Sequence, residues 1–291
     1  MNDKPALRPQ VPVGEALRAV ARDVIAEGTA ALDEQAAATA VHDFRKAMKR
    51  WRALLRLLEP LLPEEDKALR AQARDLAREL AHARDASAAL EGVDDVSDEN
   101  VLSPRTLATL RERLEEMRQR AERVALTAAK REHLRTALAT ATARIEQWPL
   151  EAIAFPDIAA RLAQGYRRAR RSMPEDWLGA EAEALHELRQ RVVDHRYQME
   201  LVVPLWPRVG RLWVDEAQRL RDRLGTCQDL AVLAQLTARQ QPLARWRSRL
   251  TPLIASRRTN HVEHARRLAR RLFAERPEAF RERLEAMWWQ P

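Results

Sequence analysis

Apolar residues recur at intervals of three and four positions over most of the chain, which is the spacing that places them on one face of an α-helix. In residues 41–58, Phe44, Met48, Trp51 and Leu55 fall on one such face. Prolines and an acidic stretch at 91–99 interrupt the pattern and divide it into roughly ten helices with short connections. No segment shows the strict alternation of a strand, so the sequence predicts an all-α fold.

The first half illustrates how these helices are delimited. Helical patterns cover 13–32, 40–58, 64–90 and 104–148, the last with a break near Thr127. Pro60 and Pro63 end the second pattern, because proline cannot continue a helix. The acidic stretch at 91–99 is expected to be a linker between the third and fourth patterns.

An internal repeat relates the two halves of the chain at a constant spacing of 144 residues. This spacing pairs His42 with His186 and Arg45 with Arg189, and it holds without a gap through two matching prolines. We therefore predict two repeats, 1–149 and 150–291, each resembling a four-helix bundle. A pseudo-twofold axis is expected to relate them around a shared basic groove or pore.

A basic stripe lies on the predicted helix that carries the first copy of the repeat. His42, Arg45, Lys49, Arg52 and Arg56 are spaced 3, 4, 3 and 4 residues apart and so occupy a sector roughly 80° wide. Like charges stacked on one helix face repel each other, so either an anionic ligand or carboxylates of neighbouring helices should neutralise them. Recurrence of the histidine and two arginines in the second repeat favours a ligand.

The second copy of the stripe is weaker than the first. Val193 stands where the first copy has Lys49, and Glu200 stands where it has Arg56. Arg196 keeps the position of Arg52, whereas His195 replaces Trp51 on the apolar face and is expected to be packed. Asp229 also recurs, as the counterpart of an aspartate in the first repeat, and is expected to orient an arginine.

Charge and composition narrow the class of partner. The 291 residues include 51 Lys or Arg and 43 Asp or Glu, a net charge of +8 that favours anionic partners. Arginine dominates, and its guanidinium matches phosphate oxygens two at a time. The lone Cys227 cannot form an internal disulfide, and no apolar run is long enough for a membrane span. A cytoplasmic protein without membrane contact is expected.

The motifs His42-x-x-Arg45-x-x-x-Lys49-Arg50-x-Arg52 and His186-x-x-Arg189 resemble those of the CHAD domain, the conserved histidine α-helical domain. The resemblance extends to Tyr166-Arg167-Arg168 and to Leu224-Gly225 followed by Asp229, and it covers nearly the whole chain. It implies a pair of helical bundles around a basic groove that binds inorganic polyphosphate. It also implies a binding and targeting role at polyphosphate granules, without catalysis, cofactor or metal.

Polyphosphate also suits the charge pattern itself, because a linear chain of phosphates can follow a stripe of cations and release condensed counterions. Free phosphate or sulfate is an expected mimic. The candidate binding residues combine the two copies of the motif with nearby basic segments. They are His42, Arg45, Lys46, Lys49, Arg50, Arg52, Arg56, His186, Arg189, Arg196, Tyr166, Arg167, Arg170, Arg171, Arg257, Arg258 and His261.

Two other functional classes remain open from the sequence. Nucleic-acid binding would use the same phosphates, but base stacking requires exposed aromatics, and most tryptophans fall on apolar faces or beside prolines. A metal-dependent helical-bundle enzyme is suggested by Glu79-x-x-His82 and Glu183-x-x-His186. These two motifs do not occupy equivalent places in the repeat, which weakens that reading. Trp288 and Trp289 are a candidate homodimer contact, with terminal packing as the alternative.

Overall fold

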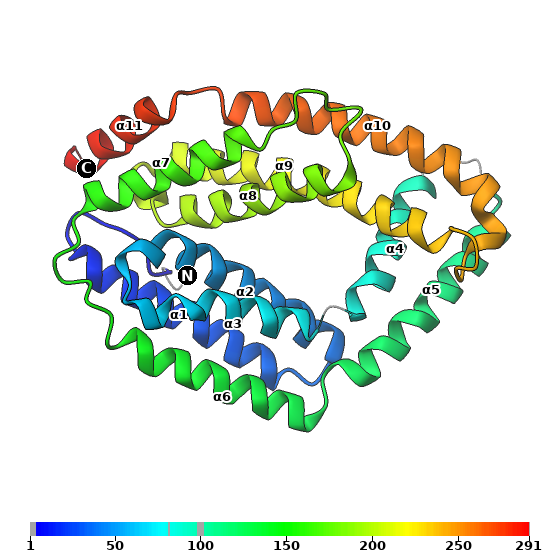
Figure 1. Ribbon diagram of the computed structural model, residues 1–291, viewed down its shortest axis with the longest axis horizontal. Coiled ribbons are helices and arrows are strands. Elements are labelled where there is room, and N and C mark those ends of the chain that lie inside the picture. The colour runs from blue at the N-terminus through cyan, green and yellow to red at the C-terminus, as the bar shows by residue number, and fades with distance from the viewer. Residues whose placement is uncertain (1–3, 81, 98–101, 291) are drawn as a thin grey trace.

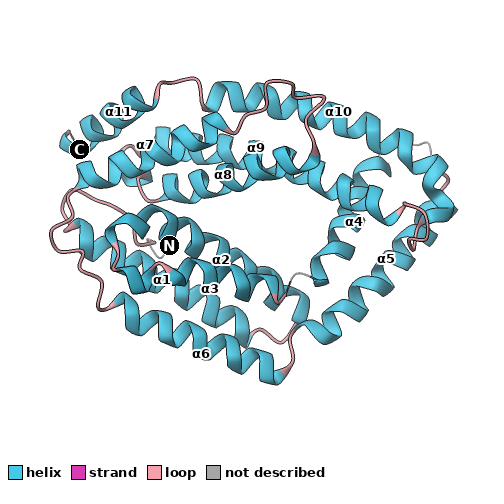
Figure 2. Cartoon of the chain, viewed as in Figure 1, coloured by secondary structure: helices cyan, strands magenta, loops and turns pink. Residues whose placement is uncertain are grey.

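The structure is a computed structural model that describes residues 4–80, 82–97 and 102–290, without the side chains of 65, 82–84 and 122–125. Helices make up the regular structure throughout this part of the chain, and no strand occurs in it (Figure 2). The predicted all-α fold is confirmed. None of the described helices combines the length and the apolarity that crossing a bilayer would require.

Eleven α-helices and four short 3₁₀ helices follow one another in the described residues. They are α1 (Val13–Asp33), α2 (Ala37–Leu58), η1 (Glu59–Leu61), η2 (Glu64–Asp66), α3 (Ala68–Arg78), α4 (His82–Ser97), α5 (Pro104–Ala125), α6 (Ala128–Ile145), α7 (Phe155–Arg171), α8 (Ala182–Glu200), η3 (Val203–Leu205), α9 (Pro207–Leu236), η4 (Ala244–Trp246), α10 (Arg247–Leu272) and α11 (Pro277–Trp289).

The helices form two groups that meet along α2 and α8 (Figure 1). One group consists of α1, α2, α3 and α6, and the other consists of α7 to α11. At the far end, α4 packs against α5 and against α9, so that these two helices connect the groups (Figure 1). The α4–α5 pair therefore belongs to the first half in sequence but lies on helices of the second half.

The helix boundaries agree with the sequence pattern in most places. The break near Thr127 is confirmed, because its side chain accepts a hydrogen bond from the Lys130 backbone and so caps α6. The prediction of an acidic linker at 91–99 is wrong for 91–97, which continue α4. Ala89, Val93 and Val96 are fully buried at helical spacing, so the apolar face outweighs the acidic residues between them. Residues 98 and 99 lie outside the described residues.

The bounds of one pair of elements follow the 144-residue spacing of the sequence repeat. The 3₁₀ helices η1 and η3 are offset by this number at both ends. In contrast, α3 and α4 of the first half correspond to the single helix α9 of the second. The pseudo-twofold axis and the division at 149/150 stay predictions.

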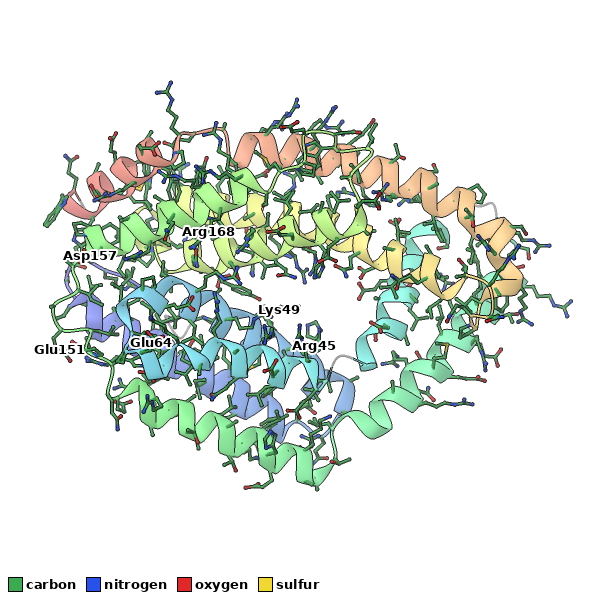
Figure 3. The ribbon with its side chains drawn as sticks, in the orientation of Figure 1. Arg45, Lys49, Glu64, Glu151, Asp157 and Arg168 are labelled. Atoms are coloured by element: carbon green, nitrogen blue, oxygen red, sulfur yellow. The ribbon has the colours of Figure 1, made fainter. Side chains whose placement is uncertain are left out.

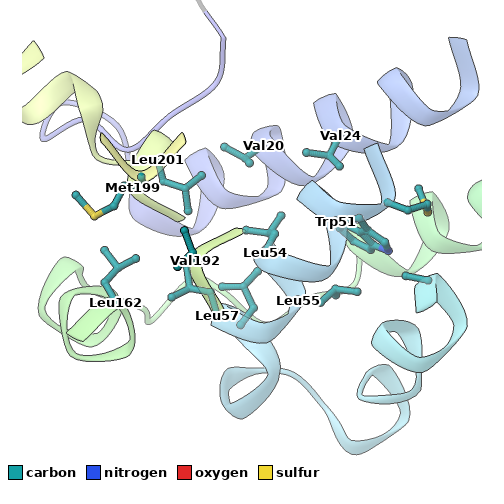
Figure 4. Close-up of a cluster of buried hydrophobic side chains, with 14 of the residues drawn as sticks. Val20, Val24, Trp51, Leu54, Leu55, Leu57, Leu162, Val192, Met199 and Leu201 are labelled. Carbon is teal, nitrogen blue, oxygen red and sulfur yellow. The ribbon is translucent and has the colours of Figure 1, made fainter. Parts of the chain in front are cut away.

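The main hydrophobic core crosses the proposed division between the repeats. Leu54 and Leu57 of α2 pack with Val192 and Met199 of α8 and with Leu162 of α7 (Figure 4). At the same crossing, the buried Gln198 side chain donates a hydrogen bond from Nε2 to the backbone oxygen of Ala53 at 3.0 Å. These contacts fix the position of α2 against α8.

A second core holds the α4–α5 pair against α9 and α10. Val93 of α4 and Leu110 of α5 are fully buried in it together with Leu233 and Leu250. Gly92 permits this close packing, because a Cβ at this position would lie 3.1 Å from the backbone oxygen of Asp229 and 3.3 Å from Leu233 Cβ. The glycine thus sets how closely α4 approaches α9.

His195 lies in an aromatic cluster between α7, α8, α9 and α11. It is 1% exposed and contacts Tyr166, Trp213 and Phe280. Trp213 Nε1 donates to His195 Nε2 at 2.9 Å, which requires a neutral imidazole protonated on Nδ1. The expectation of a packed histidine is confirmed.

The C-terminal tryptophans differ in their surroundings. Trp288 is buried and stacks on Phe155 with ring centroids 4.2 Å apart. Trp289 is 69% exposed beside it. Terminal packing therefore accounts for Trp288, and a homodimer contact through Trp289 stays a prediction.

The shared core predicts a large cost for Leu57→Ala. Leu57 is 2% exposed between the two helical groups, and a cavity there should lower the free energy of unfolding by about 2–5 kcal/mol. Urea denaturation followed by circular dichroism measures this value. The control Leu212→Ala, at a residue that is 61% exposed, should change it by less than about 0.5 kcal/mol. Equal effects of the two substitutions would contradict the described core.

Burial of His195 predicts a defined pH dependence of stability. Burial lowers the pKa of its imidazole to about 3, against about 6.5 in the unfolded chain. The contribution of neutral His195 to the free energy of unfolding is therefore complete above pH 6.5. It is lost as the pH falls towards 3, because in this range only the unfolded chain protonates the imidazole. Between pH 7 and 5, the unfolding free energy of His195→Gln should fall by about 2 kcal/mol less than that of the wild type. If the unfolding free energies of the wild type and of His195→Gln fell equally between pH 7 and 5, this assignment would be wrong.

Candidate anion-binding site

A cavity of 730 Å³ lies between α2, α4, α5, α8 and α9, where the two helical groups face each other. Its lining contains three carboxylates, from Glu91, Asp222 and Asp229. Cations outnumber them clearly. The lining includes His42 and seven Lys or Arg side chains, which are Arg45, Lys46, Lys49, Arg118, Arg189, Arg196 and Arg221.

The first copy of the motif lines this cavity from α2. Phe44 and Met48 are fully buried on the opposite face of the helix, which turns Arg45 and Lys49 towards the cavity. Figure 3 shows both side chains projecting from α2 towards the space between the two helical groups. Arg45 Nη1 also donates to the backbone oxygen of Ala77 at 3.0 Å, which holds one side of its guanidinium in place.

The second copy of the motif contributes Arg189 and Arg196 from α8. Arg189 is only 7% exposed, and its guanidinium lies against the backbone of α9 at Gly225. A Cβ at residue 225 would lie 3.5 Å from Arg189 Nε, which is an ordinary van der Waals distance, so the arginine packs directly against this position of α9. Arg196 lies over the Tyr197 ring at 4.7 Å and forms an ion pair with Glu200 at 3.0 Å.

Several lining residues were missed by sequence reasoning. Arg118 comes from α5, where it pairs with Glu115 at 2.6 Å, and Arg221 comes from α9, where it pairs with Asp222 at 2.6 Å. Neither belongs to the repeated motif, so their spacing carried no signal. Asp229, which the repeat did single out, lines the cavity together with Arg189.

The C-terminal part of the α2 stripe has a different environment. Arg56 Nη1 lies 2.6 Å from Asp194 Oδ2 of α8, and both side chains are 16% exposed. Burial raises the pKa of the Asp194 carboxyl, against the opposing influence of Arg56, Arg52, Arg191 and Arg70. Burial likewise lowers the pKa of Arg52 and of Arg56. These two arginines therefore belong to a separate cluster around Asp194.

Arg50 and His186, which were also predicted to bind, are placed away from the cavity. Arg50 forms ion pairs with Glu27 and with Asp23 of α1, the latter at 3.7 Å, and lies 4.0 Å from Glu200. His186 Nδ1 forms a hydrogen bond with Gln228 Oε1 of α9 and lies beside Cys227. The structure thus brings His42, but not His186, to the cavity.

The predicted residues of α7 serve the packing of this helix against the C-terminal segment. Tyr166 is fully buried, and its hydroxyl donates to the backbone oxygen of Glu275 at 3.1 Å. Arg170 Nη1 donates to the same oxygen at 3.1 Å, and Arg167 pairs with Glu278. Arg171 is exposed at the end of the helix. The structure does not bring these four residues to the cavity.

The predicted residues of α10 connect this helix to its neighbours. Arg257 and His261 bind Asp95 of α4 at 2.7 Å and 3.0 Å. Although burial opposes it, the hydrogen bonds from His261 and Arg257 hold the pKa of Asp95 well below its usual range. Arg258 donates to the backbone oxygen of Ala180. The contacts with Asp95 tie α4 to α10, the Arg258 contact ties α10 to the connection between α7 and α8, and none of these three residues lines the cavity.

The candidate metal motifs do not form a ligand set in the described part of the chain. No group of three or more His, Cys, Asp or Glu side chains there could hold a metal ion. Glu79 lies 3.5 Å from His133, and the side chain of His82 lies outside the described residues. Glu183 is exposed on α8, one turn before the His186 that binds Gln228.

The chain is similar to solved structures over nearly its whole length. PptA from Streptomyces chartreusis superposes with a TM-score of 0.65 at 22% sequence identity, covering 91% of this chain and 100% of that one. The CHAD domain from the plant Ricinus communis gives a TM-score of 0.62 at 22% identity, covering 98% and 95%. No curated protein sequence matches the chain. The CHAD domain family model matches residues 15–238, which is more than half of the chain, and the chain therefore belongs to the CHAD domain family.

Proposed function

We propose that the chain binds inorganic polyphosphate in the cavity between α2 and α8. One observation carries this proposal: seven Lys or Arg side chains line a single space of 730 Å³, against three carboxylates in the same lining and two, Glu115 and Glu200, that pair with Arg118 and Arg196 from outside it. Such an excess of positive charge is unfavourable without an anion, and a flexible chain of phosphates can contact several cations at once. The CHAD family is associated with polyphosphate-related proteins, which supports the choice of this polyanion.

The lining favours polyphosphate over a nucleic acid. Nucleic-acid strands bind in basic grooves by stacking bases on aromatic rings as well as by phosphate contacts. Tyr197 is the aromatic residue among the described lining residues, and the Arg196 guanidinium already covers its ring at 4.7 Å. A ligand made only of phosphates can use the cations of this lining, whereas the one tyrosine ring that could stack on a base already has a guanidinium on it.

Under this proposal the protein is a binding module and not an enzyme. Burial raises the pKa of the Cys227 thiol to about 12, so this cysteine remains protonated and is a poor nucleophile. A binding module of this kind would bring the protein to cytoplasmic polyphosphate granules. Co-localisation of the fluorescently tagged chain with stained granules tests that role.

The double substitution Lys46→Glu and Lys49→Glu should weaken polyphosphate binding about 100-fold at low salt, because two cations of the cavity become anions. Fluorescence anisotropy with end-labelled polyphosphate measures the affinity. The matched control is Arg267→Glu with Arg271→Glu, which makes the same charge change at two exposed positions of α10. An equal loss in both variants would mean that net charge, and not the cavity, governs binding.

Counterion release predicts how salt should affect the same complex. The logarithm of the association constant should fall linearly with the logarithm of salt concentration, and losing two contacts should reduce the slope by about 1.4. Titrations between low and physiological salt give both slopes. A single-stranded RNA of equal charge should compete poorly in the same assay. Displacement of polyphosphate by equimolar RNA would instead favour nucleic-acid binding.

A further inference from the structure

Five arginines lie within electrostatic range of the Asp194 carboxylate, outside the cavity lining, and a sixth, Arg74, lies within range of Arg52. Two come from α2, two from α3, and one each from α7 and α8, and they are Arg52, Arg56, Arg70, Arg74, Arg168 and Arg191. We call this set the Asp194 arginine cluster. Asp194 forms an ion pair with Arg56 at 2.6 Å and also lies within electrostatic range of Arg52, Arg168 and Arg191.

Acidic partners neutralise only part of the cluster. Arg70 pairs with Glu59 at 3.0 Å, Arg191 with Glu187 at 3.2 Å, and Arg74 with Asp75 at 3.2 Å. Glu187 and Asp75 are more than half exposed, so solvent screens these two pairs.

Arg52 and Arg168 have no carboxylate within ion-pair distance among the described residues, although neither is fully exposed. Burial and the neighbouring arginines both lower their pKa values. The cluster thus holds two guanidinium groups in an unfavourable environment that an additional anion would relieve.

The cluster continues the basic stripe of α2 beyond the cavity. Arg52 follows Lys49 of the cavity lining by three residues, which is about 4.5 Å along the helix axis and the same face of the helix. Figure 3 shows Arg168 on α7, well away from Arg45 at the other end of the stripe. A phosphate chain lying along α2 could therefore extend from the cavity into the cluster.

The sequence positions that the 144-residue repeat relates to these six arginines do not form a second arginine-rich set. At the spacing of 144 residues, Arg52 corresponds to Arg196 and Arg56 to Glu200. The remaining four arginines correspond to uncharged residues, which are Val214, Gln218, Val24 and Ala47. The concentration of arginine is therefore a one-sided feature and does not follow from the repeat.

We propose that the Asp194 arginine cluster is a second phosphate-binding site, adjacent to the cavity and filled through Arg52, Arg56 and Arg168. Its ligand is a phosphate group, supplied either by a free small phosphate or by a polyphosphate chain that extends out of the cavity. The second source rests on the proposed function, whereas the first does not. In both cases the phosphate bridges arginines of α2 and α7.

The test is the double substitution Arg52→Gln with Arg168→Gln, which removes two charges that make no ion pair among the described residues. Calorimetric titration with pyrophosphate, which is too short to extend from the cavity, tests whether the cluster binds a free small phosphate. Titration with long-chain polyphosphate tests whether a chain that extends out of the cavity reaches the cluster. The variant should lose one class of pyrophosphate site and bind long polyphosphate about tenfold more weakly. Arg267→Gln with Arg271→Gln, which removes the same charge from exposed positions, should leave both unchanged.

The outcomes separate this inference from the proposed function. Loss of a pyrophosphate site in a protein that does not bind long polyphosphate would support the cluster and reject the proposed function. Unchanged binding of both ligands by the folded Arg52→Gln, Arg168→Gln variant would overturn the second site. This holds whether or not Lys46→Glu with Lys49→Glu weakens polyphosphate binding in the cavity. If the Arg267→Gln, Arg271→Gln control lost as much binding as the Arg52→Gln, Arg168→Gln variant, the second site would be overturned as well.

A second variant tests the same site through its resident carboxylate. Asp194→Asn removes the anion that now occupies the centre of the cluster, so the melting temperature should fall without ligand. Pyrophosphate should then restore more of the melting temperature than it adds to the wild type, because it replaces the missing negative charge. Equal shifts in the two proteins would contradict a phosphate site at this position.

Discussion

The burial of one face of α2 is the constraint on which the rest of this structure depends. Phe44, Met48 and Trp51 lie in the main core, and Gln198 of α8 is hydrogen-bonded to the backbone of the same helix. Because the apolar face cannot leave the core without a large loss of buried area, the basic face cannot rotate away from its position. Mutual repulsion along the stripe is therefore built into the folded state, and the surrounding helices have to accommodate it.

The surroundings accommodate this charge in three different ways along one helix. His42, Arg45, Lys46 and Lys49 face an open cavity with few carboxylates in its lining. Arg50, on another side of the helix, is neutralised by acidic residues of α1. Arg56 meets the largely buried carboxylate of Asp194, in a cluster where arginine remains in excess. Affinity for phosphate is thus expected only where carboxylates are scarce, and the number of arginines on a helix is a poor guide to it.

Sequence reasoning recovered what depends on local periodicity. Many of the helix boundaries, the stripe of α2 and the packed His195 follow from spacing within one or two helices, whereas the predicted helix 64–90 is divided between α3 and α4. It could not recover partners that are distant in sequence, such as Asp95 and His261, which are 166 residues apart. For the same reason Tyr166 and Arg257 were predicted to bind, because they lie in arginine-rich segments, whereas in the structure they serve in packing. Arg168 was not among the predicted binding residues, although Arg167 beside it was, because charged neighbours such as Arg56 and Asp194 are distant from it in sequence.

The α4–α5 pair has a consequence for how the chain acquires its structure during synthesis. These helices form one wall of the cavity, yet Val93 and Leu110 are covered by residues of α9 and α10 that are translated more than a hundred positions later. While the nascent chain lacks those residues, its α4–α5 segment exposes apolar surface and its cationic helix has no opposite wall. Such an intermediate is prone to aggregate, and the cavity is completed only once α9 has been synthesised.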